Sequence, residues 1–296
     1  MKRLTEAEFW DESYQRRGES SQIPLEGKLK LWVKRIVGKK LTEYMRDYDD
    51  YLLWEVIYES HWARPTGAKV LEIGSAPGDY LVRLNRRFGV VPYGIEYTDS
   101  GAELNRRTFS LNGLNPGNVI HGDFFSETFQ TRYQEFFDVV VSRGFIEHFD
   151  EIRGVIEKHV SLLKPGGTLV ISVPNFRGIY YLWMRVFRKK ILGLHNLNVM
   201  RKKEFAAACQ SQGITTSFCD YYGTFSFNHF HATPRSPLCL VTGFLHKFQK
   251  LLNVAFRLFW GDRGKESSIA SPFLLFIGVK PLQATAISRP KVSLPA

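Results

Sequence analysis

The chain has 296 residues, of which 44% are apolar and 23% are charged, and its formal net charge is +11. This composition excludes a disordered chain, a collagen and a coiled coil, and the length allows one large domain with a cap. Three scattered cysteines exclude a disulfide framework or a cysteine-based zinc site, so we expect a cytoplasmic protein. Neither a spanning helix nor a secretory signal is expected, because no run reaches 18 uncharged apolar residues and residues 1–15 lack an apolar core.

Residues 1–65 are expected to form an N-terminal helical cap, or lid, that ends at the breaker Pro65-Thr66-Gly67. Beyond it, short apolar runs alternate with longer amphipathic stretches. The runs are residues 69–73, 90–96, 118–121, 137–142 and 168–173. Such alternation predicts right-handed βαβ units around a parallel sheet, and continuous apolar runs are typical of strands buried on both faces.

The regular alternation ends after the fifth run. A helix near 201–212 and strands near 214–221 and 273–280 are predicted beyond it. Two further segments, 179–192 and 241–259, combine aromatic or aliphatic side chains with Lys and Arg, and both are predicted to be helices.

The charge excess lies in this part of the chain, since residues 176–296 hold 17 of the 40 Lys and Arg residues but 4 of the 29 Asp and Glu residues. Segment 241–259 places an apolar stripe on one helical face, formed by Val241, Leu245, Phe248, Leu252, Ala255 and Phe259. We expect this stripe to pack on the sheet as part of an inserted cap over residues 223–270. One alternative is that 179–192 and 241–259 lie on an anionic membrane surface, and another is an anionic soluble acceptor bound by Arg and Lys.

A glycine-rich turn between the first apolar run and the next helix is the most informative stretch. It reads EIGSAPG over residues 72–78, without the middle glycine of a dinucleotide-binding turn, and Pro77 removes an amide that could bind phosphate. Glu96 ends the second run, where a carboxylate can accept hydrogen bonds from ribose hydroxyls. Asp123 and Phe124 follow the third run, where they can bind an adenine amino group and stack on its ring. These residues predict a nucleoside pocket without a phosphate site, which disfavours a nicotinamide dehydrogenase.

The set of motifs resembles class I S-adenosylmethionine-dependent methyltransferases. The motifs are EIGSAPG, Glu96, GDFF (122–125), FDVVVSRGFIEHF (137–149) and LLKPGGTLVISVPN (162–175). The resemblance implies a Rossmann-like, seven-stranded, mostly parallel α/β sheet with helices on both faces and an antiparallel last strand. The implied division is an N-terminal cap over 1–65, a core over 66–222 and 271–282, an inserted cap over 223–270 and a frayed tail over 283–296.

The same resemblance implies that S-adenosylmethionine is the cofactor. Glu72 would contact the methionine amine, Glu96 would hold the ribose, and Tyr97 would flank the adenine. Ser142 and Arg143 would lie beside the donor sulfur. The complete set of implied donor-binding residues is Glu72, Gly74, Ser75, Ala76, Gly78, Glu96, Tyr97, Asp123, Phe124, Ser142 and Arg143.

Methyl transfer to oxygen or nitrogen usually needs a base. Glu147 and His148 follow the fourth run, and His148 is the predicted base because histidine titrates near neutral pH; alternatively, the two residues merely begin the next helix. The EH pair resembles a signature of ubiquinone-biosynthesis-type O-methyltransferases, which favours O-methylation of a small-molecule, lipid-associated or polysaccharide-precursor acceptor. Some of those enzymes carry E-x-x-E-H and a divalent metal, but Gly144 replaces the first Glu here, so no metal is expected.

The turn also resembles that of certain RNA ribose methyltransferases. Their Lys-Asp-Lys-Glu set has its Asp after the fourth strand, where this chain has Ser142-Arg143-Gly144. The [ND]-P-P-[YF] loop of amino-methylating enzymes is also absent. RNA methylation is therefore the lesser alternative, together with a non-catalytic scaffold of the same fold. Nucleic acid is not the expected partner, and the oligomeric state is left open.

Overall fold

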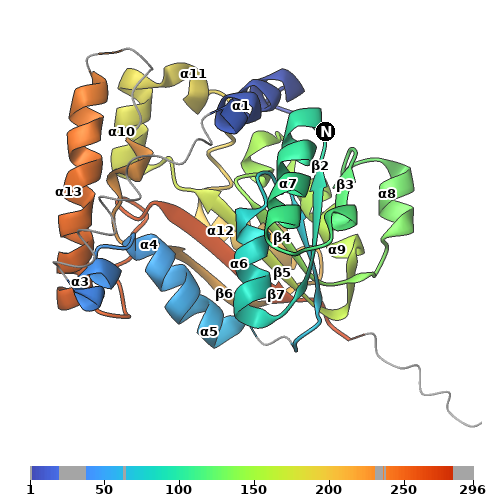
Figure 1. The fold of residues 1–296 in the computed structure, drawn as a ribbon. Helices are drawn as coiled ribbons and strands as arrows, with labels where there is room; N and C mark the ends of the chain where they lie inside the picture. The colour runs from blue at the N-terminus through green and yellow to red at the C-terminus, as the bar shows by residue number, and fades with distance from the viewer. Residues whose placement is uncertain (1, 20–37, 63–64, 231–235, 237, 283–296) are drawn as a thin grey trace, which may run out of the picture.

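A computed structural model describes residues 2–19, 38–62, 65–230, 236 and 238–282. Its centre is one seven-stranded sheet with the strand order β3-β2-β1-β4-β5-β7-β6 (Figure 1). The strands are β1 (Lys69–Ile73), β2 (Val91–Glu96), β3 (Val119–His121), β4 (Phe137–Arg143), β5 (Leu163–Pro174), β6 (Thr215–Tyr222) and β7 (Phe273–Val279). Only β7 runs antiparallel to its neighbours among these strands, so the predicted mostly parallel sheet is confirmed.

Helices cover both faces of the sheet, as predicted (Figure 1). Val70 and Leu71 are both fully buried, because successive side chains of a strand point to opposite faces and each face has its own apolar core. One core includes α8 (Glu127–Arg132), α9 (Ile152–Ser161) and α12 (Lys202–Gln210). The other includes α6 (Asp79–Phe88), α7 (Asp99–Leu111), the π-helical turn η1 (Leu52–Ile57) and α5 (Tyr58–His61).

The N-terminal segment packs on the rest of the chain in two places. Helix α1 (Ala7–Glu19) packs on α7, and Leu4 N donates a hydrogen bond to His148 O, 2.8 Å away. Helices α3 (Lys39–Tyr44) and α4 (Tyr48–Tyr51) lead into η1 and α5. The predicted helical content of residues 20–37 and the predicted fraying of 283–296 lie outside the described residues.

The remaining helices are α10 (Gly178–Phe187), α11 (Lys189–Leu192) and α13 (Leu238–Phe259), and the short turns are η2 (Pro116–Asn118), η3 (Ile146–His148) and η4 (Phe227–His229). Helix α13 contacts α3, α4 and η4 instead of the sheet. Within the described ranges, no helix is long and apolar enough to cross a membrane.

The stripe predicted for segment 241–259 is divided in the structure: Leu245, Leu252 and Ala255 are half-buried, and Leu252 packs beside Tyr48 and Leu52 and not on the sheet. Val241, Phe248 and Phe259 are exposed, whereas Gln249 and Asn253 are buried. The polar pair faces inward because it finds partners there: Gln249 Nε2 donates to Asn253 Oδ1 at 2.8 Å, and Gln249 Oε1 accepts from Phe227 N at 2.8 Å. Asn253 Nδ2 donates in turn to an Asp47 carboxylate oxygen at 3.2 Å. Helix α13 therefore buries Gln249 and Asn253 together with Phe256, and it exposes Leu240, Phe244, Leu251 and Leu258.

Candidate active site

A cavity of about 310 Å³ lies at the carboxyl ends of β1, β2 and β4, beside the point where the strand order reverses. Open α/β sheets bind their ligands at this position. Its lining residues are Arg3, Thr5, Trp10, Ser13, Tyr14, Ile73, Gly74, Ala76, Ile95, Glu96, Tyr97, Gly122, Asp123, Phe124, Phe125, Arg143, Gly144, Phe145, His148 and Phe149. We call this space the donor cavity. The predicted loop, strand-end acids and aromatic residues thus come together on its floor, and residues near α1 form its cover.

The glycine turn is shaped by two residues in the left-handed region, Gly74 (φ 68°) and Gly78 (φ 97°). A Cβ on Gly78 would lie 2.3 Å from Asn105 Oδ1, so the close approach of α7 requires glycine there. Asn105 Nδ2 also donates to Ser75 Oγ at 2.5 Å. Gly74 and Ala76 line the donor cavity, whereas Ser75 and Gly78 hold the turn in place from behind it.

Glu96 is buried at the end of β2 and lines the donor cavity. Its Oε1 accepts from Tyr97 N at 3.0 Å and from Thr98 Oγ1 at 3.1 Å, while Oε2 has a long contact of 3.4 Å with Ala76 N. Burial raises the pKa of Glu96 above its ordinary value, although these donors oppose the shift. Oε2 therefore retains capacity to accept hydrogen bonds from a ligand.

The far end of the donor cavity is aromatic and carries an ion pair. Arg3 Nη2 lies 2.6 Å from Asp123 Oδ1, and the guanidinium lies over the Tyr97 ring at 5.1 Å. Phe124 is buried beneath, in edge contact with Phe145. Arg3 was not predicted from the sequence, because a single Arg near residue 1 belongs to no motif.

Ser142 does not lie on the donor cavity, unlike its neighbour Arg143. Its hydroxyl is 3.0 Å from His159 Nε2, and His159 Nδ1 is 2.7 Å from Val155 O. Because a carbonyl only accepts, the proton is on Nδ1 and Nε2 accepts from Ser142. Strand alternation therefore sends the Ser142 side chain to the α9 face, and a position of Ser142 beside the donor sulfur stays a prediction for its backbone.

Arg143 lines the donor cavity from the end of β4. Its guanidinium lies over the Tyr80 ring at 4.3 Å, and Nη1 is 4.0 Å from Glu72 Oε1. Glu72 is buried, and its Oε2 has no hydrogen-bond partner among the described residues. Burial raises the pKa of Glu72 to about 8, against the opposing effect of Arg143. Glu72 is not itself a lining residue of the donor cavity, but its unused oxygen beside Arg143 fits a cationic group of a ligand.

A second cavity, of about 440 Å³, adjoins the donor cavity and shares Arg143 and Gly144 with it. We call it the acceptor cavity, because a methyl acceptor, expected from the sequence, needs a space beside the donor. Its other lining residues are Asp49, Asp50, Leu53, Trp54, Asp79, Tyr80, Arg83, Ser172, Val173, Pro174, Tyr222 and Phe273. The two cavities thus meet where β4 ends.

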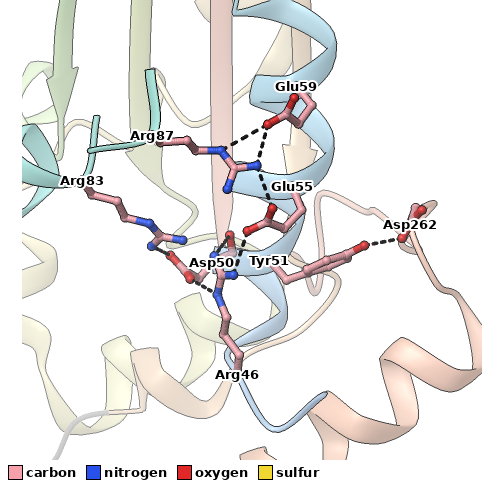
Figure 2. Close-up of polar contacts among 8 residues, drawn as sticks. All are labelled: Arg46, Asp50, Tyr51, Glu55, Glu59, Arg83, Arg87 and Asp262. Atoms are coloured by element: carbon pink, nitrogen blue, oxygen red, sulfur yellow. Dashed lines mark hydrogen bonds and ion pairs between the residues drawn. The ribbon is translucent and has the colours of Figure 1, made fainter. Parts of the chain in front are cut away.

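Ion pairs fix the wall of the acceptor cavity that α4 and η1 form (Figure 2). Arg83 of α6 lies 2.5 Å from Asp50 Oδ1, and Arg87 lies 2.7 Å from Glu55 Oε2. Because these pairs tie the N-terminal cap to α6, they also set the position of Asp49, the neighbour of Asp50.

Asp49 lines the acceptor cavity without the ion pairs that Asp50 forms with Arg46 and Arg83. Burial, and then the neighbouring charges of Asp47 and Asp50, raise the pKa of Asp49 to about 7. A carboxylate with such a pKa can accept a proton at neutral pH. Asp49 was not predicted from the sequence, because an acid within an acidic helical run carries no signal of its own.

Of the predicted catalytic pair, His148 lines the donor cavity and Glu147 does not. His148 Nδ1 is 2.8 Å from Thr5 Oγ1 and 3.2 Å from Leu194 O, and burial and His195 lower its pKa to about 4. Glu147 is buried, which raises its pKa to about 8. In the described part of the chain, Glu147, His148 and His195 form the cluster whose ligand-type atoms are close enough to hold a metal, all within 4.8 Å of one another.

Comparison with known proteins gives a family and a fold. A family model described as a methyltransferase domain matches residues 43–216. A ubiquinone biosynthesis O-methyltransferase from Shewanella sp. (strain ANA-3) is 27% identical over 110 residues, which are 37% of this chain and 44% of that protein. The chain therefore matches less than half the length of this curated relative.

Two solved structures share the fold at low sequence identity. Geranyl diphosphate C-methyltransferase from Streptomyces coelicolor A3(2) has a TM-score of 0.53 at 11% identity and covers 78% of each chain. The second is phosphoethanolamine N-methyltransferase 2 from Haemonchus contortus, solved with S-adenosyl-L-methionine. Its TM-score is 0.50 at 15% identity, and the match covers 77% of this chain and 53% of that one. Since the family model spans more than half of the chain, the chain belongs to the methyltransferase domain family, as a class I S-adenosylmethionine-dependent enzyme.

Proposed function

We propose that the chain transfers a methyl group from S-adenosylmethionine to an oxygen of a small-molecule acceptor. The observation that carries the proposal is the meeting of the donor and acceptor cavities at Arg143 and Gly144. A donor in the first cavity and an acceptor in the second would be held in contact, and such positioning supplies much of the rate of a bimolecular reaction. Distant similarity to an O-methyltransferase favours oxygen as the methylated atom.

The residues of the donor cavity fit S-adenosylmethionine, which supplies the methyl group when bound. The unused Oε2 of Glu72 suits the methionine amine. Glu96 Oε2 suits the ribose hydroxyls, and Asp123, Phe124 and Tyr97 surround the space for the adenine. We propose that the Gly74–Gly78 turn and Ser142 contact the donor through their backbone atoms. The Ser75 and Ser142 hydroxyls would not touch it.

We propose Asp49 as the base that takes the acceptor proton, because it lines the acceptor cavity and titrates near neutral pH. His148, the base predicted from the sequence, is the second candidate. A proton on its Nδ1 satisfies Leu194 O and the Thr5 hydroxyl, which leaves the Nε2 lone pair available. Its low pKa makes it a weaker base than Asp49. Glu147 is proposed to support His148.

Donor binding should release a proton from Glu72. Its pKa of about 8 keeps the carboxyl neutral at pH 7, and a bound ammonium group would favour the ionised form. The affinity for S-adenosylhomocysteine should therefore rise by about tenfold per pH unit between pH 6 and 8. Calorimetry in two buffers of different ionisation enthalpy measures the proton, and Glu72→Gln should abolish both the proton release and the pH dependence. A pH-independent wild-type affinity would contradict this role.

Methyl transfer should survive dialysis against EDTA unchanged, because no metal is expected from the sequence. The assay compares rates before and after dialysis and after addition of Mg²⁺. A large loss of rate on dialysis, with recovery of the rate when Mg²⁺ is added, would contradict the expectation. If the His195→Ala variant shows no such recovery, the metal is assigned to the Glu147, His148 and His195 cluster.

The function is tested with methyl-labelled S-adenosylmethionine and a cell extract that is then separated into lipid, aqueous small-molecule and RNA fractions. Glu96→Ala serves as the blank. Label in the lipid or aqueous fraction, absent from the blank, supports the proposal. Label in RNA would replace it with the RNA alternative, and tight S-adenosylhomocysteine binding without transfer would favour the scaffold alternative.

A further inference from the structure

The outward face of α13 is an apolar surface that no other part of the described chain covers. Leu240, Phe244, Leu251 and Leu258 lie within about 40° of one another around the helix, and 62–83% of each residue is exposed. Monomeric proteins rarely expose a contiguous apolar face of this kind without a function for it. The inner face is already committed to the hydrogen bonds of Gln249 and Asn253, so α13 cannot simply rotate to bury its leucines.

Helix α10 extends this surface. Leu182 and Val186, one turn apart, are 64% and 70% exposed. Ring contacts join the two helices through η4: Trp183 lies 4.9 Å from Phe230, Phe230 lies 5.4 Å from Phe227, and Phe227 lies 6.4 Å from Phe248. Both helices lie at the end of the molecule away from α8 (Figure 1). We call the exposed apolar residues of α10 and α13 the cap face.

The charged side chains beside the cap face, on α10 and α13, are all basic. Lys247 and Lys250 are exposed on α13, and Arg185 is exposed on α10. Neither Leu238–Phe259 nor Gly178–Phe187 contains an Asp or a Glu. A second copy of the chain on this face would bring cations against cations, and RNA would leave the leucines in water. An anionic lipid surface satisfies both the apolar and the basic side chains.

We propose that the cap face seats the protein on anionic phospholipid bilayers, with the side chains of Leu240, Phe244 and Leu251 inserted between the head groups. Lys247, Lys250 and Arg185 would remain at the level of the phosphates. The attachment is peripheral, and it does not depend on which acceptor the enzyme methylates.

The test is flotation of the full chain with vesicles of phosphatidylcholine alone or with 30% phosphatidylglycerol. We expect flotation with the anionic vesicles only, at least a tenfold weaker binding for Phe244→Ser/Leu251→Ser, and a similar loss for Lys247→Glu/Lys250→Glu. Leu111→Ser, at an equally exposed leucine of α7, is the matched control and should float like the wild type. Unchanged S-adenosylhomocysteine affinity shows that the variants are folded.

Three results would overturn the proposal. The first is no flotation of the wild type, and the second is equal flotation of the Phe244→Ser/Leu251→Ser variant. The third is a wild-type dimer in sedimentation velocity that the same substitutions dissociate, because the cap face would then be an interface between two copies.

Discussion

Replacement of Glu96 by alanine is expected to weaken S-adenosylhomocysteine binding by about 10²- to 10³-fold, the largest effect of a single donor-cavity residue. The reason is that the buried carboxylate would hold both ribose hydroxyls, and a hydrogen bond to a charged group contributes about 1.5–3 kcal/mol. Isothermal titration calorimetry measures the affinity. The proposal places no other group at the ribose that could replace Glu96.

Two variants separate this loss from a folding defect. Glu96→Gln keeps the shape and the acceptor for Thr98, and should lose less affinity than Glu96→Ala. Glu103→Ala removes an exposed acid of the adjacent α7 and should bind like the wild type. A folded Glu96→Ala protein with wild-type affinity would contradict the assignment of the ribose site.

Replacement of Asp49 by asparagine is expected to lower kcat by about 10²- to 10⁴-fold, the range that general-base catalysis supplies. The wild-type rate should rise with pH through an apparent pKa near 7, since the base must be ionised, and this rise should disappear in the variant. The measurement is the pH dependence of kcat/KM with the acceptor identified in the labelling experiment.

The thermal stability of the Asp49→Asn variant is the control that separates a loss of catalysis from a folding defect. The pKa of Asp49 is raised from 3.8 to about 7 in the folded state, so the free energy of unfolding falls as the pH rises from about 4 to 7 and stays lower above pH 7. The variant should therefore melt no lower than the wild type at pH 8. If Asp49→Asn keeps its activity and His148→Gln loses it, the base is His148, as predicted from the sequence.

Much of the fold follows from local sequence signals. The buried strands were predictable because continuous apolar runs such as 137–142 need cover on both faces, and the sheet shows that cover. The orientation of α13 was not predictable from its amphipathic pattern, which distinguishes two faces without telling which is buried. That choice depends on Asp47 and Phe227, which lie far away in the sequence.

The candidate site was likewise predictable where the signals are local and not where they depend on tertiary contacts. Glu96 and Asp123 follow strand ends and both line the donor cavity, so their convergence was predictable from the motifs, whereas Glu72 lies behind Arg143. The direction of the Ser142 side chain was predictable, because adjacent residues of a strand point to opposite faces and Arg143 faces Tyr80. Arg3 and Asp49 enter the site through tertiary contacts of the N-terminal segment, which no local pattern records.

The most direct test of the two-cavity arrangement is an experimental structure with S-adenosylhomocysteine bound. We expect its amine at Glu72, its ribose at Glu96 and its sulfur beside Arg143 and Gly144, facing the acceptor cavity and Asp49. A sulfur that faces His148, with the acceptor cavity closed off from it, would contradict the account.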